Sequence, residues 1–293
     1  MTRSAGRILV TGSAGFVGTA LKKVGGPNVV GVTRRDADLS DPKAIADLCA
    51  ELQPESIIHL AAAGVARRAA DSLGVVGINV EMTANVVNAA PPDCRVLIAG
   101  SMSEYGRGGI LSEDGRCTPS TAYGISKLAA SLFALAYPKG HEILVARLFG
   151  VFGCGEPADR LFPSLISRLG EGKPVPLSDG QQLRDFVHVD DAARTLLSLC
   201  ASPIPPQRIV NVGTGVAVRV RDAALWIAQG LSADPTLLRF GARSRAPGDE
   251  DALIADVTLL ESVTGSVPPQ RLEVGLDLDM FGACSARSHS SFG

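Results

Sequence analysis

The sequence predicts an α/β protein, built as a Rossmann-type doubly wound parallel sheet with a smaller α/β substrate-binding lobe. Two observations predict the large sheet. Short apolar runs alternate with longer helical patterns through the first half of the chain, as in consecutive βαβ units. A glycine-rich segment, Thr11 to Gly18, follows the first apolar run and opens the first helical pattern, which is the context of a dinucleotide-binding turn.

Length and composition narrow the class of protein. The 293 residues allow one large domain or two modest ones. A net charge of −2 and an aromatic content of 4% do not favour a nucleic-acid or membrane surface, so we expect a small-molecule partner. The six cysteines form no Cys-x-x-Cys pair and no cluster with histidine, which predicts reduced thiols and no metal site. The N-terminus has no signal-peptide pattern, which favours a cytoplasmic protein.

The predicted division of the chain follows the change in pattern after the fifth strand. Residues 1–148 form the dinucleotide-binding domain, to which the chain returns at about 185–205. Residues 149–184 and 206–282 form the substrate-binding lobe. The small polar segment 283–293 is expected to be disordered.

The first apolar run, residues 8–10, is the first strand. In the turn after it, Gly12 permits a tight bend, Gly15 lets the backbone approach a pyrophosphate, and Gly18 allows close packing of helix on sheet. The cofactor contacts expected from this segment are Gly12, Ala14, Gly15, Phe16, Val17 and Gly18.

The end of the second strand, residues 29–32, bears on the choice of cofactor. An NAD site usually has an acid here for the ribose 2′-hydroxyl, whereas this chain has Thr33, Arg34 and Arg35, and arginine suits a 2′-phosphate. We therefore expect NADP(H) in preference to NAD(H). The alternative is that both arginines are solvated loop charges. Asp38 and Leu39 follow, and such a pair can hold the adenine.

The third strand, residues 56–60, ends in small side chains after a helix over 42–51. Leu60, Ala61 and Ala62 leave room for a cofactor at the crevice of the sheet. His59 has no second ligand nearby, so we interpret it as a structural histidine. The next helix, 76–90, carries Asn79.

The fourth strand, residues 95–99, leads to Ser101. A hydroxyl just beyond the carboxyl end of a central strand lies where substrate and nicotinamide meet, although serine also favours turns for local reasons.

Tyr123 and Lys127 lie four residues apart in an apolar run, 122–136, that is long enough for a helix. Residues at this spacing share one helical face, so the ammonium can approach the phenol. A neighbouring cation lowers the pKa of a tyrosine and makes it a useful acid-base. The alternative is a solvated pair that occurs by chance.

Later segments complete the alternation. The predicted elements are a strand over 141–147, helices over 161–169 and 190–199, a strand over 208–211 and a helix that contains Trp226.

These segments come in the order and spacing of the extended short-chain dehydrogenase/reductases. The chain resembles, more narrowly, the NAD-dependent epimerase/dehydratase family that modifies nucleotide sugars. The resemblance is carried by residues 11–18, 59–62, Asn79, 101–106, Tyr123 and Lys127, and it extends to about Asp256. It implies a nucleotide-diphosphate sugar as the partner. It also implies a homodimer formed through the helix of Tyr123 and its neighbour.

By this resemblance, Ser101, Tyr123 and Lys127 form the catalytic set. Tyr123 is the general acid-base at a sugar oxygen, Ser101 positions and polarises that oxygen, and Lys127 binds the nicotinamide ribose and lowers the pKa of the tyrosine. Asn79, Tyr123 and Lys127 complete the implied cofactor contacts. Family dehydratases carry an Asp-Glu pair directly after the catalytic serine or threonine, whereas this chain has Met102 and Ser103, which argues against 4,6-dehydration.

The resemblance also implies the substrate contacts. Arg184, before Asp-Phe, matches a diphosphate ligand, and Arg245 resembles a second one, although an alanine separates it from the following proline. Family members usually have asparagine where Gly150 stands. The implied substrate contacts are Ser101, Met102, Ser103, Tyr123, Phe149, Gly150, Arg184 and Arg245.

The favoured function is an NADPH-dependent 4-ketoreductase of a nucleotide-linked 4-keto-6-deoxyhexose. The arginines after the second strand and the missing acid pair both support it. The alternative is an NAD-dependent nucleotide-sugar epimerase, which needs the same three catalytic residues; a dehydratase is less favoured. A remote alternative is a non-catalytic dinucleotide-binding regulator, for which the intact catalytic set is unexpected.

Overall fold

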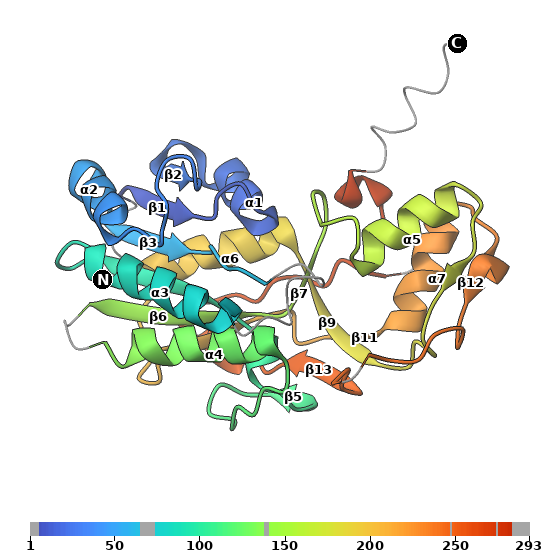
Figure 1. Ribbon diagram of the computed structural model, residues 1–293. Coiled ribbons are helices and arrows are strands. Elements are labelled where there is room, and N and C mark those ends of the chain that lie inside the picture. The colour runs from blue at the N-terminus through green and yellow to red at the C-terminus, as the bar shows by residue number, and fades with distance from the viewer. Residues whose placement is uncertain (1–5, 65–73, 138–140, 247, 274, 283–293) are drawn as a thin grey trace, which may run out of the picture.

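The chain folds into two lobes that lie side by side (Figure 1). The computed structural model describes residues 6–64, 74–137, 141–246, 248–273 and 275–282. The expectation of disorder over 283–293 therefore falls outside the described residues. Within the described ranges, no helix combines the length and the apolar character needed to cross a membrane.

Six parallel strands form the central sheet of the larger lobe. In spatial order they are β2 (Val29–Val32), β1 (Ile8–Thr11), β3 (Ser56–His59), β4 (Arg95–Ser101), β6 (Glu142–Leu148) and β10 (Ile209–Val212). The strand order reverses at β1, because β2 lies on one side of it and all later strands lie on the other. Such a switch point opens a crevice at the carboxyl ends of the strands, where doubly wound proteins bind ligands.

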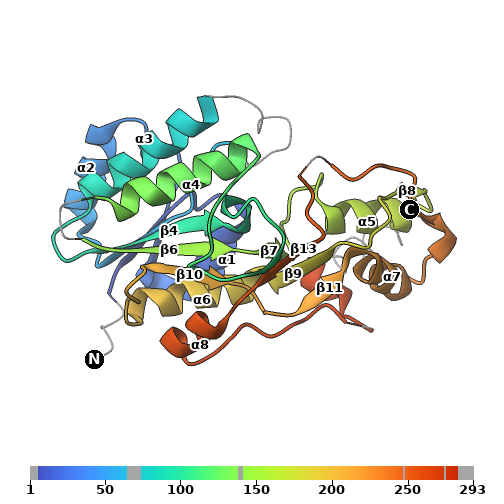
Figure 2. The ribbon, with the colours of Figure 1, turned by 90° about the horizontal axis from the view of Figure 1, so that it is seen from below.

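Helices cover both faces of this sheet, as the two ribbon views show (Figures 1 and 2). One face carries α2 (Pro42–Leu52), α3 (Gly74–Ala89) and α4 (Ala122–Leu135), and the other carries α1 (Phe16–Gly25), with η1 (Gly26–Asn28) after it, α6 (Val189–Ala201) and α8 (Thr258–Thr264). Along β1, Ile8 and Val10 pack into the core under α1 and α6, whereas Leu9 packs under α2 and α3. This alternation explains why the strands are continuous apolar runs, since both faces are buried.

The smaller lobe is built on two further sheets. The larger one has the order β11 (Ala217–Arg219), β9 (Leu183–His188), β13 (Ala252–Ala255) and β5 (Gly109–Leu111), with β7 (Gly150–Phe152) also paired to β9; the other pairs β12 (Leu238–Arg239) with β8 (Val175–Pro176). The helical elements around them are α5 (Leu161–Gly170), α7 (Val220–Gly230), η3 (Pro235–Leu237) and η4 (Leu278–Phe281). A further short turn, η2 (Met102–Glu104), follows β4.

The predicted fold class is confirmed, and the predicted lobe boundaries need adjustment. Strand β10, assigned from the sequence to the substrate-binding lobe, pairs with β6 and completes the large sheet. Strand β5, assigned to the dinucleotide-binding domain, pairs with β13 in the smaller lobe. The pairings cross the boundaries because strands are joined by hydrogen bonds, which a one-dimensional pattern does not record.

One buried carboxylate ties the returning segments of the chain together. Asp185 on β9 is fully buried and accepts hydrogen bonds from the backbone N–H groups of Thr214, Gly215 and Ala255, and from the Thr214 hydroxyl. Burial raises the pKa of Asp185, and these hydrogen bonds act in the opposite direction. The carboxylate thus joins β9 to β13 and to the turn after β10.

Replacing Asp185 should therefore destabilise the fold. We expect Asp185→Ala to lower the free energy of unfolding by about 3 kcal/mol, because it leaves several buried donors without an acceptor. Asp47→Ala is the control, since its ion pair with Lys43 is on the surface and such pairs contribute about 1 kcal/mol or less. Chemical denaturation of both variants measures the difference. Equal stability of the two would mean that Asp185 does not hold the strands.

Candidate active site

The glycine-rich turn after β1 has the geometry of a phosphate-binding turn. Gly12 adopts φ +72°, and a Cβ there would lie 2.7 Å from the Ala61 nitrogen. A Cβ at Gly18 would lie 2.5 Å from the Gly12 oxygen, so α1 packs directly on the turn. No side chain caps α1 at Gly15, so the N–H groups of its first turn face outward for an anion. These residues fit a dinucleotide; their contacts with it remain a prediction.

Asn79 links two segments at the edge of this crevice by hydrogen bonds. Its Oδ1 accepts from the Ala63 N–H at 2.7 Å, and its Nδ2 donates to the Ser126 hydroxyl at 2.9 Å. It thereby connects the segment after β3, which includes Ala61 and Ala62, to the helix that carries Tyr123. In this structure Asn79 supports the expected cofactor site through its neighbours.

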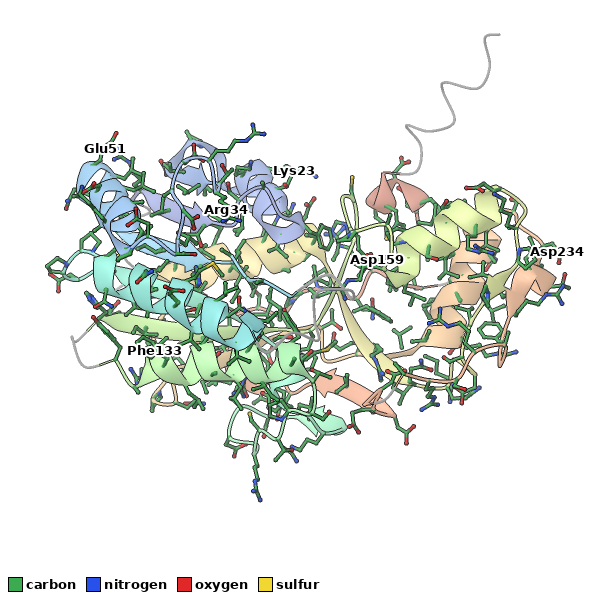
Figure 3. The ribbon with its side chains drawn as sticks, in the orientation of Figure 1. Lys23, Arg34, Glu51, Phe133, Asp159 and Asp234 are labelled. Carbon is green, nitrogen blue, oxygen red and sulfur yellow. The ribbon has the colours of Figure 1, made fainter. Side chains whose placement is uncertain are left out.

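The segment after β2 is organised by local pairs. Thr33 donates from its N–H and its hydroxyl to Asp36, and Arg34 forms an exposed ion pair with Asp38 at 3.2 Å. Arg34 projects from this turn at the surface (Figure 3). The hydrogen bond from the Ser40 N–H and the Arg34 guanidinium together lower the pKa of Asp38. Both arginines are exposed, and recognition of a 2′-phosphate would require Arg34 to turn from Asp38.

The three predicted catalytic residues come from two elements that meet at the carboxyl edge of the sheet. Ser101 ends β4, and Tyr123 and Lys127 lie one turn apart on α4, which Thr121 caps by accepting from the Gly124 N–H at 3.1 Å. Ser101 lies close enough to Tyr123 for its hydroxyl to influence the pKa of the phenol. Lys127 is buried beneath the tyrosine, at 5% exposure.

Several groups act on the pKa of Tyr123. Burial raises the pKa of Tyr123, while the Arg160 guanidinium and the hydrogen bond with Ser101 act to lower it. Lys127 is not among the groups that shift this pKa. Burial lowers the pKa of Lys127 itself, and the Glu104 carboxylate opposes that change. Burial of the phenol is the largest effect on its pKa in this structure. The expected lowering of the tyrosine pKa by the lysine stays a prediction.

His59 behaves as a structural histidine. It is 2% exposed, and its Nδ1 is 2.8 Å from the Thr11 hydroxyl. Burial, with the Lys127 charge acting in the same direction, lowers the pKa of His59 to about 3, so the ring is neutral. Across the part of the chain that the structure describes, no group of three His, Cys, Asp or Glu side chains is placed to hold a metal ion.

Two residues that the sequence analysis missed approach the site from the smaller lobe. Arg160 is the N-cap of α5, and its charge acts on both Tyr123 and Glu156. Burial raises the pKa of Glu156 to about 7, and its Oε2 has no hydrogen-bond partner within the described residues. The neighbouring Asp159 lies between the two lobes (Figure 3). No spacing in the sequence connects this loop to Tyr123, since only the docking of the lobes does so.

The predicted sugar contacts divide into two kinds. Met102 and Ser103 form η2, next to Ser101, and are half-buried. Phe149, in contrast, is 3% exposed and packs on Tyr105 with ring centroids 6.4 Å apart, so it belongs to the core. A Cβ at Gly150 would lie 2.7 Å from the backbone carbonyl oxygen of Asp185, which explains why this chain has glycine there.

The two predicted phosphate ligands are paired with carboxylates. Arg184, 10% exposed, forms an ion pair with Asp249, and Arg245 binds Asp179 at 2.9 Å and Asp251 at 2.5 Å. These pairs place both guanidinium groups in one region of the smaller lobe, at the β9–β13 sheet and the loop before β13. A diphosphate would have to replace these carboxylates, so the phosphate contacts remain a prediction.

Fold and site together define an extended short-chain dehydrogenase/reductase. Residues 8–213 match the model of the NAD dependent epimerase/dehydratase family, and the chain belongs to that family.

Several similar proteins match nearly the whole chain. A dTDP-glucose 4,6-dehydratase of Streptomyces griseus is 27% identical over 92% of this chain and 91% of the relative. The UDP-glucose epimerase YtcB of Bacillus subtilis, described as uncharacterised, is 26% identical over 92% and 95%. The solved structure of MoeE5 in complex with UDP-glucose and NAD is 32% identical, with a TM-score of 0.80 over 97% of this chain and 100% of that one. MoeE5 has also been solved with UDP-glucuronic acid and NAD.

The predicted role of Tyr123 as the acid-base can be tested by removing its hydroxyl. We expect Tyr123→Phe to fold and to bind the dinucleotide normally, but to lose at least about a thousandfold in kcat, within the range of general acid-base catalysis and the lost orientation of substrate. Steady-state kinetics and a binding titration measure the two properties. Near-normal turnover in this variant would show that another group transfers the proton.

Arg160 should tune the pH dependence of the reaction. Its charge lowers the pKa of Tyr123, so Arg160→Ala should raise that pKa further. If the phenolate takes the proton from the sugar, the acidic limb of the kcat profile should move to higher pH and the rate near neutrality should fall. Arg107→Ala, an exposed arginine of the η2–β5 segment, is the control. If the acidic limb of the kcat profile does not move in Arg160→Ala, Arg160 does not influence the pKa of Tyr123.

Proposed function

We propose that this enzyme is an NAD-dependent nucleotide-sugar epimerase acting at C4, or at a neighbouring carbon, of a nucleotide-diphosphate hexose. The observation that carries the proposal is that Ser101, at the end of β4, lies beside Tyr123 on α4, with Lys127 one turn further along the helix and with Met102 and Ser103 next to the serine. This set can move a proton to and from a sugar hydroxyl. It offers no acid at Met102 or Ser103 for the elimination of water, so dehydration is not proposed.

The residues divide the reaction between them. Tyr123, as the phenolate, takes the proton of the sugar hydroxyl while the C–H bond at the same carbon breaks, and Ser101 holds the oxygen. A bound nicotinamide would supply the acceptor and the donor of the hydride. Tyr123 then gives the proton back to the oxygen when the ketone is reduced from its opposite face. The sugar is inverted and there is no net redox change.

The relatives support the choice of cofactor and substrate. MoeE5, at 32% identity, was solved with NAD and a UDP-sugar, which supports NAD and a UDP-linked substrate. The dTDP-glucose 4,6-dehydratase of Streptomyces griseus supports dTDP as the other candidate carrier. Arg184 and Arg245 would hold the diphosphate after exchanging their carboxylate partners for it. Exposed apolar side chains support a homodimer formed through α3 and α4, which lie side by side (Figure 1). They are Ile125, Leu132 and Phe133 on α4 and Ile78 on α3.

A second candidate is the NADPH-dependent 4-ketoreductase that the sequence favoured. The observation in its favour is the end of β2, where Thr33, Arg34 and Arg35 stand in place of an acid. The two candidates share their catalytic residues and differ in whether the cofactor is recycled in place or consumed.

Cofactor retention distinguishes them. We expect protein purified without added nucleotide, then denatured, to release stoichiometric NAD. An empty site that binds NADPH in preference to NADH would contradict the epimerase and support the ketoreductase. Arg34→Ala is the matched variant: it should leave a retained NAD unchanged, whereas in a ketoreductase it should weaken NADPH much more than NADH.

A further inference from the structure

A buried carboxylate lies directly beneath the loop that carries Ser101. Glu104, the last residue of η2, is 0% exposed. Its Oε1 accepts from the Ser101 N–H at 2.9 Å and from the Ser131 hydroxyl at 3.1 Å, and its Oε2 accepts from Arg147 Nε at 2.9 Å. One side chain therefore joins the serine loop, helix α4 and strand β6.

This arrangement is costly for a purely structural contact. Removing a carboxylate and a guanidinium from water costs several kcal/mol for each ion, and apolar side chains of similar volume often replace such pairs with no loss of stability. Arg147 is 3% exposed, and its Nη1 has no hydrogen-bond partner within the described residues. Stability alone gives little reason for this ion pair, so its position relative to the site becomes informative.

Glu104 contacts both elements whose separation determines the catalytic geometry. On the loop, it holds the N–H of Ser101, whose hydroxyl accepts from the Ser103 N–H at 3.2 Å and lies near Tyr123. On α4, it holds Ser131, one turn beyond Lys127. A shift of one element against the other would separate the serine from the tyrosine. Its negative charge also opposes the effect of burial on the Lys127 ammonium.

We propose that Glu104 is a positioning residue of the active site, whose carboxylate clamps the Ser101 loop to helix α4 and thereby fixes the distance between Ser101 and Tyr123. The proposal rests on the proposed function, in which these two side chains act on one sugar oxygen. Glu104 reaches no substrate itself; it acts through Ser101 and through α4.

The test distinguishes two roles of Glu104: holding the Ser101 loop against α4, and acting only as the counter-charge of Arg147. The double variant Glu104→Val/Arg147→Met removes both charges together and retains similar volume. We expect it to fold with reduced stability, because the Ser101 N–H and the Ser131 hydroxyl lose their acceptor. It should bind the dinucleotide and lose about tenfold to a hundredfold in kcat with little change in KM, as for small displacements of catalytic groups. In hydrogen exchange, the backbone of residues 100–105 should exchange faster than in the wild type.

Two further variants keep the test informative if the double variant does not fold. Ser131→Ala removes only the α4 end of the clamp and should lower kcat several-fold without changing KM; Glu104→Gln retains the acceptor for Ser101 and should keep more activity than any valine variant. Glu142→Gln, at the amino end of β6, weakens another ion pair of the same sheet, with Arg95, and should leave kcat unchanged.

The outcomes are distinct. Slower turnover together with faster exchange in residues 100–105 supports the proposal. The proposal is overturned if the double variant folds and has wild-type kcat, or if its residues 100–105 exchange as in the wild type. If only Ser131→Ala folds, wild-type kcat in that variant overturns the proposal. Tyr123→Phe is measured in parallel: if it remains active, the proposed catalytic function has failed, whereas an inactive Tyr123→Phe beside a fully active double variant rejects the role of Glu104 alone.

Discussion

The buried ion pair between Glu104 and Arg147 is the interaction on which the centre of this molecule depends. Arg147 also lies over the ring of Tyr105, 4.5 Å from its centroid, and the Tyr105 hydroxyl donates to Asn211 at 2.7 Å. Asn211 on β10 in turn donates to the Leu111 carbonyl and to Glu113. A continuous polar chain thus runs from the serine loop through the large sheet to the smaller lobe. Removing one partner of a link leaves the other unpaired, which is expensive in such an interior.

This network of polar contacts explains how a common fold acquires a defined site. The doubly wound sheet brings the ends of β1, β3 and β4 to one edge, which is sufficient to place a dinucleotide but does not determine the position of a catalytic hydroxyl to within a fraction of an ångström. Glu104 adds that precision at Ser101, and Thr121 and Ser131 fix the helix that carries Tyr123. The smaller lobe then supplies Arg160, whose charge partly offsets the effect of burial on the phenol.

The sequence predicted those features that depend on local pattern. Apolar runs located the strands of the large sheet to within one or two residues, and the spacing of Gly12 and Gly18 indicated the turn that the structure contains. The four-residue spacing of Tyr123 and Lys127 placed them on one face of α4. The Ser101 and Glu104 spacing fits a capping box, which the structure contains. The burial of Glu104 and its ion pair could not be predicted, because its partner Arg147 lies on another strand. Arg160 and Glu156 depend on the docking of the lobes. The carboxylate partners of Arg184 and Arg245 are likewise products of tertiary structure.

The central claim is that a hydride leaves a sugar carbon for the nicotinamide and returns to the same carbon under control of Tyr123. The most direct measurement supplies UDP- and dTDP-hexoses carrying deuterium at C4 and follows the label by mass spectrometry in the bound dinucleotide and in the sugar. The account predicts that deuterium appears on the nicotinamide during turnover, returns to C4 of the inverted sugar without loss to water, and does neither in Tyr123→Phe. Inversion with the label washed out into solvent, or with no label ever reaching the dinucleotide, would contradict it.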